Sequence, residues 1–128
     1  MDISSTLTHT VLGRPERTAD DLALLFHPSY VQVTDGVVSD YDEFVAHITH
    51  VRTVAADGEI VVHEAVHEGN RVADRHTVTI TKRDGSRTSF EVLLIGELAD
   101  DGRLLRVTET TRQLSGDRAD ANLGRARS

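Results

Sequence analysis

The chain has 128 residues, of which 38% are hydrophobic, enough to fill the core of one domain and too few for two ordinary domains. It contains no cysteine, which excludes disulfides, thiolate metal sites and cysteine nucleophiles. The formal net charge is −7 and there is no tryptophan, so the chain repels phosphate and offers little surface for base stacking. We therefore expect no nucleic-acid partner.

Neither a targeting segment nor a membrane span is indicated. The first residues lack the basic and apolar regions of a secretory signal. The longest uninterrupted apolar run is Leu22–Phe26, far short of the about 20 residues that a membrane span requires. These features predict a cytoplasmic protein with no membrane association.

Two short helices are expected first. Apolar residues recur at every fourth position over 3–11, which is typical of an amphipathic helix, and Gly13 ends this helix. Thr18 is the expected N-cap of the second helix, which continues until Pro28. Both helices are predicted to present one narrow apolar face.

From Tyr30 the periodicity changes to two, which is typical of a strand. Val31, Val33 and Asp35 then share one face, and the even-numbered residues point the other way. Because the two valines are apolar, this face is predicted to turn toward the core, with Asp35 on it. Gly36 permits the turn that follows.

The longest helix is expected after Asp40, which forms a capping box with Glu43. Phe44 and Ile48 begin its apolar stripe, and His47 flanks this stripe, so its side chain should look toward the sheet. We consider His47 a candidate ligand-binding residue. A histidine in such a place is more often a structural group with satisfied hydrogen bonds.

Four long strands complete the predicted domain. They cover residues 59–68, 71–82, 88–98 and 104–114, separated by glycine-containing turns typical of hairpins. Helices followed by long antiparallel strands predict an α+β domain over 1–114, whose curved sheet wraps around the helices as a cone and leaves a pocket at its wide end. Residues 115–128 are polar and small, and predict a loose tail or an arm that orders only against a partner.

This order of elements, with the segments LALLFHPSYVQVTDG, SDYDEFVAHI, NRVADRHTVTI and DDGRLLRVTETT, resembles the nuclear transport factor 2-like superfamily of cystatin-like fold. That superfamily includes ketosteroid isomerases and SnoaL-like polyketide cyclases. The resemblance implies that Asp35 lies where such isomerases hold their base. The sequence departs from them in having no tyrosine in the first helix and apolar residues 92–95 where an acid belongs, which points away from a steroid isomerase.

Two ionisable residues interrupt an apolar row of the second long strand. Asp74 and His76 share a face by alternation, about 6.6 Å apart, so that Asp74 could orient His76 as a base. The alternative is that the two side chains satisfy each other in the core, or lie at an exposed part of the strand. Both interpretations remain open from the sequence.

Glu109 is predicted to face inward on the last strand, and SnoaL-like cyclases are similar in drawing an acidic residue and a histidine from late strands. If Glu109 and Asp35 line one apolar cavity, burial and mutual repulsion should raise the pKa of at least one of them. The alternative is a salt bridge from Glu109 to a nearby arginine such as Arg75.

The sequence thus supports two functions. In the first, a cofactor-free isomerase or cyclase acts on a small apolar carbonyl compound: Asp35 or His76 removes a proton, Glu109 returns or stabilises it, and Asp74 orients His76. In the second, the chain is a non-catalytic ligand-binding or dimerisation module. No metal ion or cofactor is expected in either case.

A partner is expected on the outer face of the sheet. Leu93, Ile95, Arg106, Thr108 and Arg112 share the face of the last two strands that points away from the helices. Such a mixed surface is suited to a two-fold partner, and we predict a homodimer through the sheet.

Overall fold

The computed structural model describes residues 1–126. The helices are α1 (Ile3–Val11), α2 (Thr18–Ala23) and α3 (Tyr41–Val54), with short 3₁₀ turns η1 (Pro15–Arg17), η2 (Arg118–Asp120) and η3 (Leu123–Arg125). The strands are β1 (Phe26–Thr34), β2 (Val37–Ser39), β3 (Ala55–Glu68), β4 (Arg71–Lys82), β5 (Arg87–Leu98) and β6 (Leu104–Ser115). The predicted α+β architecture is confirmed. Within residues 1–126 no helix is long and apolar enough to cross a membrane.

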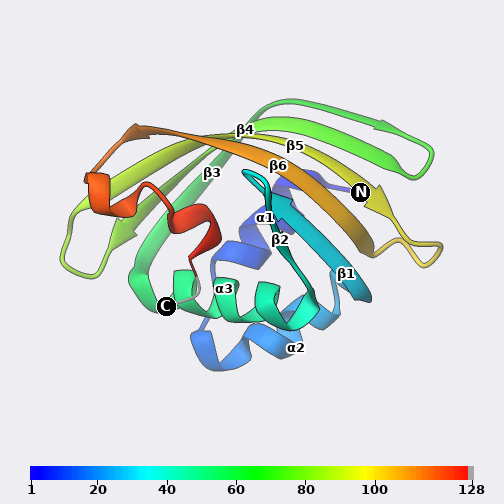
Figure 1. Ribbon diagram of the computed structural model, residues 1–128, viewed down its shortest axis with the longest axis horizontal. Coiled ribbons are helices and arrows are strands. Elements are labelled where there is room, and N and C mark those ends of the chain that lie inside the picture. Colours follow the sequence, from blue (N-terminus) through cyan, green and yellow to red (C-terminus); the bar gives the residue numbers. More distant parts are fainter. Residues whose placement is uncertain (127–128) are drawn as a thin grey trace.

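All six strands form one curved sheet in the order β2-β1-β6-β5-β4-β3 (Figure 1). Strands β3 to β6 form the predicted antiparallel meander. The sheet as a whole is mixed rather than antiparallel, because β1 runs parallel to β6. The short edge strand β2, which the periodicity did not predict, pairs with β1 as a hairpin.

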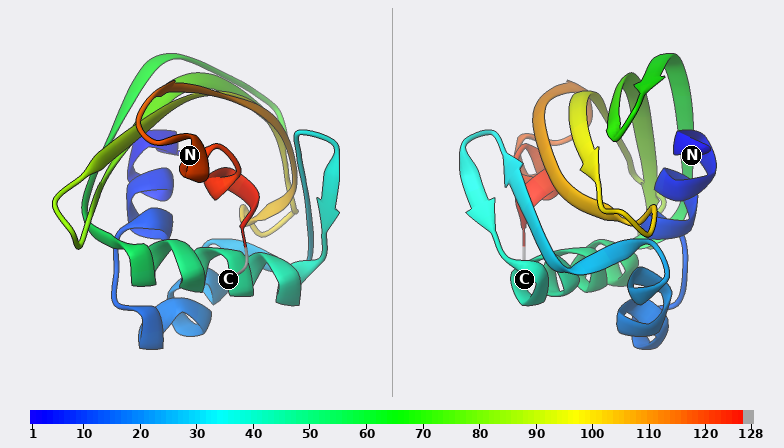
Figure 2. Two further views of the ribbon diagram at one scale, coloured as in Figure 1. Left: turned by 60° about the vertical axis from the view of Figure 1, so that its left-hand side comes forward. Right: turned by 90° about the vertical axis from the view of Figure 1, so that its right-hand side faces the viewer.

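The helices fill the concave side of the sheet. The sheet arches over α3, while α1 stands along one side of the arch (Figure 2). Helix α1 packs against β3, and α3 packs against β1. The rings of Phe26, Tyr30 and Phe44 lie 4.7–4.8 Å apart between β1 and α3. This aromatic cluster forms one wall of the core.

Helix α3 begins as predicted. The Asp40 carboxylate accepts a hydrogen bond from the Glu43 N–H at 2.9 Å, and the Glu43 carboxylate accepts one from the Asp40 N–H at 3.1 Å. Both bonds satisfy N–H groups that have no partner inside the helix. The capping box is therefore confirmed.

Helix α2 differs from its predicted form. It ends at Ala23, and its N-cap is Arg17; the Thr18 hydroxyl instead donates to the Pro15 carbonyl. Phe26 is already the first residue of β1, and Pro28 lies in that strand where its register with β6 is irregular. An interrupted register tolerates a residue without an N–H. The short apolar spacing alone did not distinguish helix from strand here.

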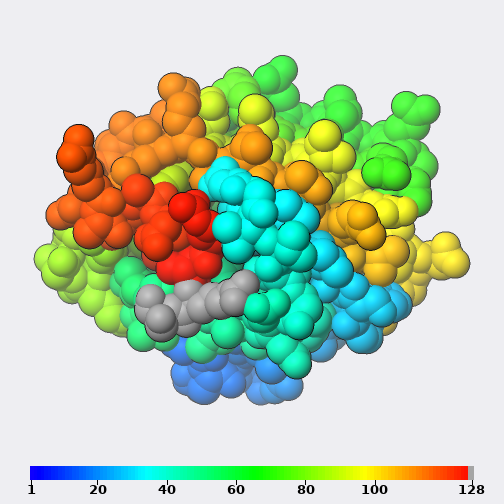
Figure 3. Space-filling model, in the orientation of Figure 1, coloured from blue at the N-terminus to red at the C-terminus, as the bar shows by residue number. Residues whose placement is uncertain are grey.

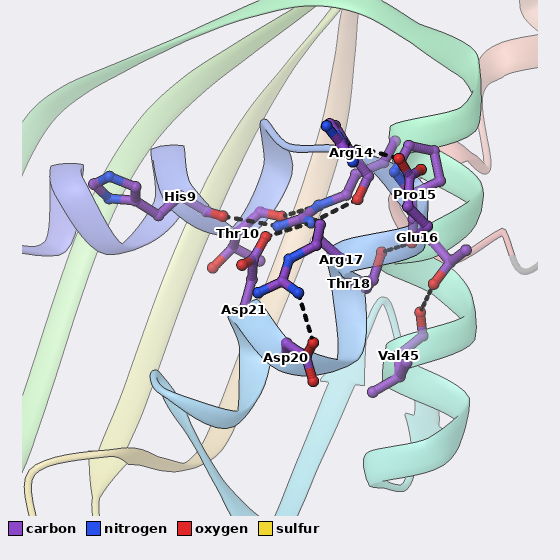
Figure 4. A network of polar contacts seen from close by, with 12 residues as sticks. His9, Thr10, Arg14, Pro15, Glu16, Arg17, Thr18, Asp20, Asp21 and Val45 are labelled. Atoms are coloured by element: carbon purple, nitrogen blue, oxygen red, sulfur yellow. Dashed lines mark hydrogen bonds and ion pairs between the residues drawn. The ribbon is translucent and has the colours of Figure 1, made fainter.

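A buried arginine connects the helices. Arg52 on α3 is 1% exposed, and its guanidinium donates to the carbonyls of His9, Thr10 and Arg14. It also pairs with Asp21 at 2.8 Å. Figure 4 shows the surrounding residues, with the last turn of α1 on one side and α2 on the other. Because carbonyls at the end of a helix have no intrahelical donor, Arg52 completes α1 from outside.

Residues 115–126 are not the loose tail that their composition predicts. They leave β6, form η2 and η3, and return to the space between the arch and α3 (Figure 2). Lys82 pairs with Asp120 at 2.9 Å, and Leu123 belongs to the hydrophobic core at 8% exposure. Residues 127 and 128 of the predicted tail lie outside the described residues.

Candidate functional site

A cavity of about 120 Å³ lies between the concave face of the sheet, α1, α3 and the C-terminal segment. Most of its lining is apolar, and includes Phe26, Phe44, Ile48, Val92, Leu94 and Leu104. A few polar side chains interrupt this lining. An apolar cavity with a small number of convergent polar groups is the usual form of a ligand site.

His76 and Asp74 are both buried, at 4% and 7% exposure, as the alternation of β4 predicts. His76 lines the cavity, and its Nδ1 lies 2.9 Å from Asp74 Oδ2. Because the carboxylate accepts this hydrogen bond, the proton of a neutral imidazole resides on Nδ1. The Nε2 lone pair is then the part of the ring that can accept a proton from a ligand.

The inward face of β1 is the opposite of the predicted one. Gln32 and Thr34 are buried, while Asp35 is not. Asp35 and Gly36 are the two central residues of the β1–β2 turn, with φ of +50° and +83°, as a type I′ hairpin requires. Strand alternation therefore ends before Asp35. Tyr30 gives the signal that could have revealed this, because its ring and that of Phe26 are large enough to decide which face is buried.

A directed chain of hydrogen bonds runs along the inward face of β1. The Tyr30 hydroxyl donates to Gln32 Oε1 at 2.7 Å, and Gln32 Nε2 donates to Thr34 Oγ1 at 2.9 Å. The Thr34 hydroxyl in turn donates to Glu109 Oε1 at 3.0 Å. Each donor points toward Glu109. Sequence analysis did not select Tyr30, Gln32 or Thr34, since it placed them on the outer face.

Glu109 on β6 lines the cavity, and burial raises the pKa of its carboxyl group to about 7. The hydrogen bond from Thr34 and the proximity of His76 act in the opposite direction and lower the pKa. Burial outweighs both effects, since moving a carboxylate out of water disfavours its charged form. Glu109 is therefore close to half protonated at neutral pH.

Glu109 does not form the alternative salt bridge with Arg75. Arg75 instead pairs with Glu64 at 3.0 Å and with Glu91 at 3.5 Å on the outer face. The hydrogen bonds of Glu109 come from neutral donors, Thr34 and, more weakly, Gln32 at 3.4 Å. A carboxyl group held in this way can gain and lose a proton without breaking an ion pair.

The Asp35 side chain lies outside the cavity, although its backbone N–H donates to the Glu109 carbonyl at 3.0 Å. Its carboxylate accepts hydrogen bonds from the backbone and hydroxyl of Thr111, at 2.8 and 2.5 Å, and lies 3.3 Å from Arg125. It is not among the residues that line the cavity. The expectation that Asp35 and Glu109 share one cavity is therefore wrong.

His47 lies on the buried face of α3 and lines the cavity. Its Nδ1 is 2.6 Å from the carbonyl oxygen of Ala126, to which it donates. The cavity thus brings together His47, His76 and Glu109, with Asp74 behind His76. Within residues 1–126, His, Cys, Asp and Glu side chains form no cluster of three or more suited to a metal ion.

A cone-shaped sheet closed by helices around an internal cavity defines a nuclear transport factor 2-like protein. The SnoaL-like domain family matches residues 13–107, and the chain belongs to this family. It is 31% identical over 97 residues to uncharacterized protein C11D3.04c of Schizosaccharomyces pombe, a match that covers 76% of this chain and 74% of that protein.

Two solved structures show the same fold. AclR of Streptomyces galilaeus, a proposed hydroxylase, superposes with a TM-score of 0.70 at 16% identity, covering 97% of this chain and 82% of that one. IdmH of Streptomyces antibioticus, a proposed polyketide cyclase, superposes with a TM-score of 0.66 at 16% identity, covering 87% of this chain and 92% of that one. At such identities the likeness concerns the fold, and the chemistry must be argued from the site.

Proposed function

We propose that this protein is a cofactor-free enzyme of the isomerase or cyclase kind, which transfers a proton on a small, mostly apolar carbonyl compound. The observation that carries the proposal is the presence, in one apolar cavity, of an Asp74–His76 pair and of a carboxyl group, Glu109, with a pKa near 7. General acid–base catalysis is most effective when the pKa of the group lies near the working pH.

His76 is the proposed base. Its Nε2 accepts a proton from the carbon next to the carbonyl group, and the electron pair of the broken C–H bond moves onto the carbonyl oxygen as an enolate. Asp74 holds the ring by its Nδ1–H and stabilises the imidazolium that forms. A histidine with such a buried carboxylate partner is held in one tautomer and one orientation.

Glu109 is the proposed acid. Its Oε1 accepts the hydrogen bond from Thr34, so the proton of the neutral carboxyl group resides on Oε2. From there it is donated to the enolate oxygen or to carbon. The imidazolium of His76 then releases its proton to solvent, and the Glu109 carboxylate takes up a proton from solvent, so that both groups return to their starting states. The ring or chain that surrounds the reacting carbonyl would contact the apolar lining.

The first test is proton exchange at carbon. A panel of small apolar ketones is incubated with the protein in D₂O, and loss of the α-proton signal is followed by ¹H NMR. We expect exchange above the buffer rate for at least one ketone, and His76→Gln and Glu109→Gln should each reduce this rate by about 100-fold or more.

His63→Gln is the matched control for this test, because His63 is exposed on β3, outside the cavity lining, with its Nε2 2.7 Å from the Thr77 hydroxyl. It should exchange protons at the wild-type rate. The enzymatic proposal is wrong if the wild type never exceeds the buffer rate, or if His76→Gln and Glu109→Gln both exchange protons at the wild-type rate. A non-catalytic ligand-binding module would then be the better description.

We further propose that the outer face of the sheet forms a homodimer. Leu93, Ile95 and Val66 are 51%, 60% and 69% exposed on it. The strand register sets Ile95 beside Ala73 and Thr108, and Ala73 beside Val66, so the apolar side chains form a row across the strands. Arginine and glutamate side chains alternate beside this row. In a two-fold dimer each patch can therefore meet opposite charges on its copy.

Light scattering tests this proposal directly. The wild type should be a dimer at micromolar concentration. Ile95→Glu should be a monomer, because it places a carboxylate of each protomer in the apolar patch that the two protomers share. Val38→Glu, at an equally exposed valine on β2, should remain a dimer. A monomeric wild type, or a dimeric Ile95→Glu variant, would contradict an interface through this face.

A further inference from the structure

The segment that follows β6 closes one side of the cavity. It turns away from the sheet at Gly116, whose φ is +115° and where a Cβ atom would collide with Thr88. It then crosses toward α3, and in Figure 3 its red atoms fill the surface beside the cyan β2 hairpin. Because the segment leaves β6 at a fixed point and then crosses the cavity, it forms one wall of the cavity.

Leu123 is the part of this wall that matters for a ligand. It is the only large apolar side chain between residues 115 and 126, it is 8% exposed, and it lines the cavity together with Gly124. The remaining residues of the segment are polar or small. One buried side chain therefore provides most of the apolar contact that holds the segment down.

Polar contacts anchor the segment to the body of the domain, beginning with the Asp117 carbonyl, which accepts a hydrogen bond from Gln113 Nε2 at 2.8 Å. Arg125 pairs with Asp35 at 3.3 Å, the Ala126 carbonyl accepts a hydrogen bond from His47 at 2.6 Å, and Asp120 pairs with Lys82 at 2.9 Å. Asp35 and Arg125 are partly exposed, and such ion pairs contribute little stability each. Lys82 and Asp120 are less exposed, at 20% and 13%, so the Asp35–Arg125 pair is the weaker of the two ion pairs that position the segment.

The cavity is small compared with pockets that bind organic ligands. With Leu123 in place the cavity measures about 120 Å³, whereas pockets for organic ligands typically measure about 300–1,000 Å³. Removing Leu123 from the lining would enlarge the cavity. A ligand larger than the present cavity can enter only when the wall moves.

We propose that residues 117–126 form a lid over the cavity, that Leu123 determines which ligand sizes are accepted, and that Asp35 anchors the lid. The proposal rests on the ligand cavity of the proposed function and does not depend on the reaction. It also gives Asp35 a role that fits its position: its carboxylate joins β6 at Thr111 to the lid at Arg125.

The first experiment uses N-phenyl-1-naphthylamine, a neutral apolar fluorophore that exceeds the closed cavity in size. Leu123→Ala should bind it about tenfold more tightly than the wild type, because less apolar contact must be broken to open the lid. Leu114→Ala, at a residue 46% exposed and outside the cavity lining, should bind it as the wild type does. Equal affinity of wild type and Leu123→Ala would overturn the role of Leu123.

Hydrogen exchange measured by mass spectrometry provides the second experiment. Exchange of the amides of 117–126 should rise about tenfold in Leu123→Ala and about threefold in Asp35→Asn, with strands β4 and β5 unaffected. Asparagine keeps the left-handed turn, and it removes the charge and one of the two acceptor oxygens. Asp100→Asn, in an exposed turn, is the control.

Unchanged exchange in Asp35→Asn would show that Asp35 is no anchor. Because Asp35→Asn leaves the cavity lining intact, it decides this point even if Leu123→Ala fails to fold. Absence of ketone proton exchange in the wild type would remove the proposed reaction, and the fluorophore and amide measurements would still decide on the lid.

Discussion

Glu109→Gln should make the protein more stable than the wild type at pH 8, by up to about 3 kcal/mol, and equally stable near pH 4.5. The unfolded carboxyl group titrates near 4.5, whereas burial raises the pKa of the folded one to about 7. Between these values the folded state binds more protons, so rising pH favours unfolding of the wild type. The size follows from the separation of the two pKa values at about 1.4 kcal/mol for each pH unit.

Urea unfolding followed by far-ultraviolet circular dichroism, at several pH values from 4.5 to 8, measures this difference. Glu68→Gln, at an exposed position on β3, is the control and should follow the wild-type curve at every pH. If the curves for Glu109→Gln and wild type run parallel, the carboxyl group is not buried in its charged form. Burial of the carboxyl group causes both the raised pKa and the loss of stability at high pH. Without the loss of stability, the raised pKa on which proton transfer by Glu109 depends would be absent too.

Arg52→Met should lower the free energy of unfolding by about 3–5 kcal/mol, since it leaves buried acceptors without a donor. The carbonyls of His9, Thr10 and Arg14 and the carboxylate of Asp21 all lose their charged partner. Methionine fills much of the same volume, so the loss measures hydrogen bonding more than packing. Urea unfolding at pH 7 gives the value.

Arg17→Met provides the comparison for Arg52. Arg17 also pairs with an aspartate, Asp20, at 2.9 Å, but both side chains are more than half exposed. Its removal should change stability by less than about 0.5 kcal/mol. A loss below about 1 kcal/mol for Arg52→Met would mean that water reaches the vacated carbonyls and that the helices do not depend on this arginine.

The antiparallel meander and the long helix were the most predictable parts of the fold. Strict alternation over many residues and glycine-containing turns define β3 to β6 to within a few residues at each end, and the Asp40–Glu43 spacing defines the start of α3. The same alternation correctly places Asp74 and His76 inside, because a strand of 12 residues leaves only one register that buries its apolar face.

Two parts of the site could not be predicted in this way. In β1 the valines and the aromatic residues compete for the buried face, and only the packing of Phe26 and Tyr30 on α3 decides between them. In the C-terminal segment a single leucine among polar residues gives no periodicity, so its burial depends on the cavity that it meets. The sequence pattern predicts structure where many residues of one element indicate the same face. The buried face of β1 and the burial of Leu123 instead depend on one or two contacts with distant elements.

The parallel pairing of β1 with β6 has a consequence for how the chain is made. Thr34 and Glu109, which this pairing brings together, are separated by 75 positions in the chain. On the ribosome, the edge of β1 that pairs with β6 therefore remains open until β6 has been synthesised. Contacts of such long separation form slowly, and the acid of the cavity receives its hydrogen bond from Thr34 only after β6 has been synthesised.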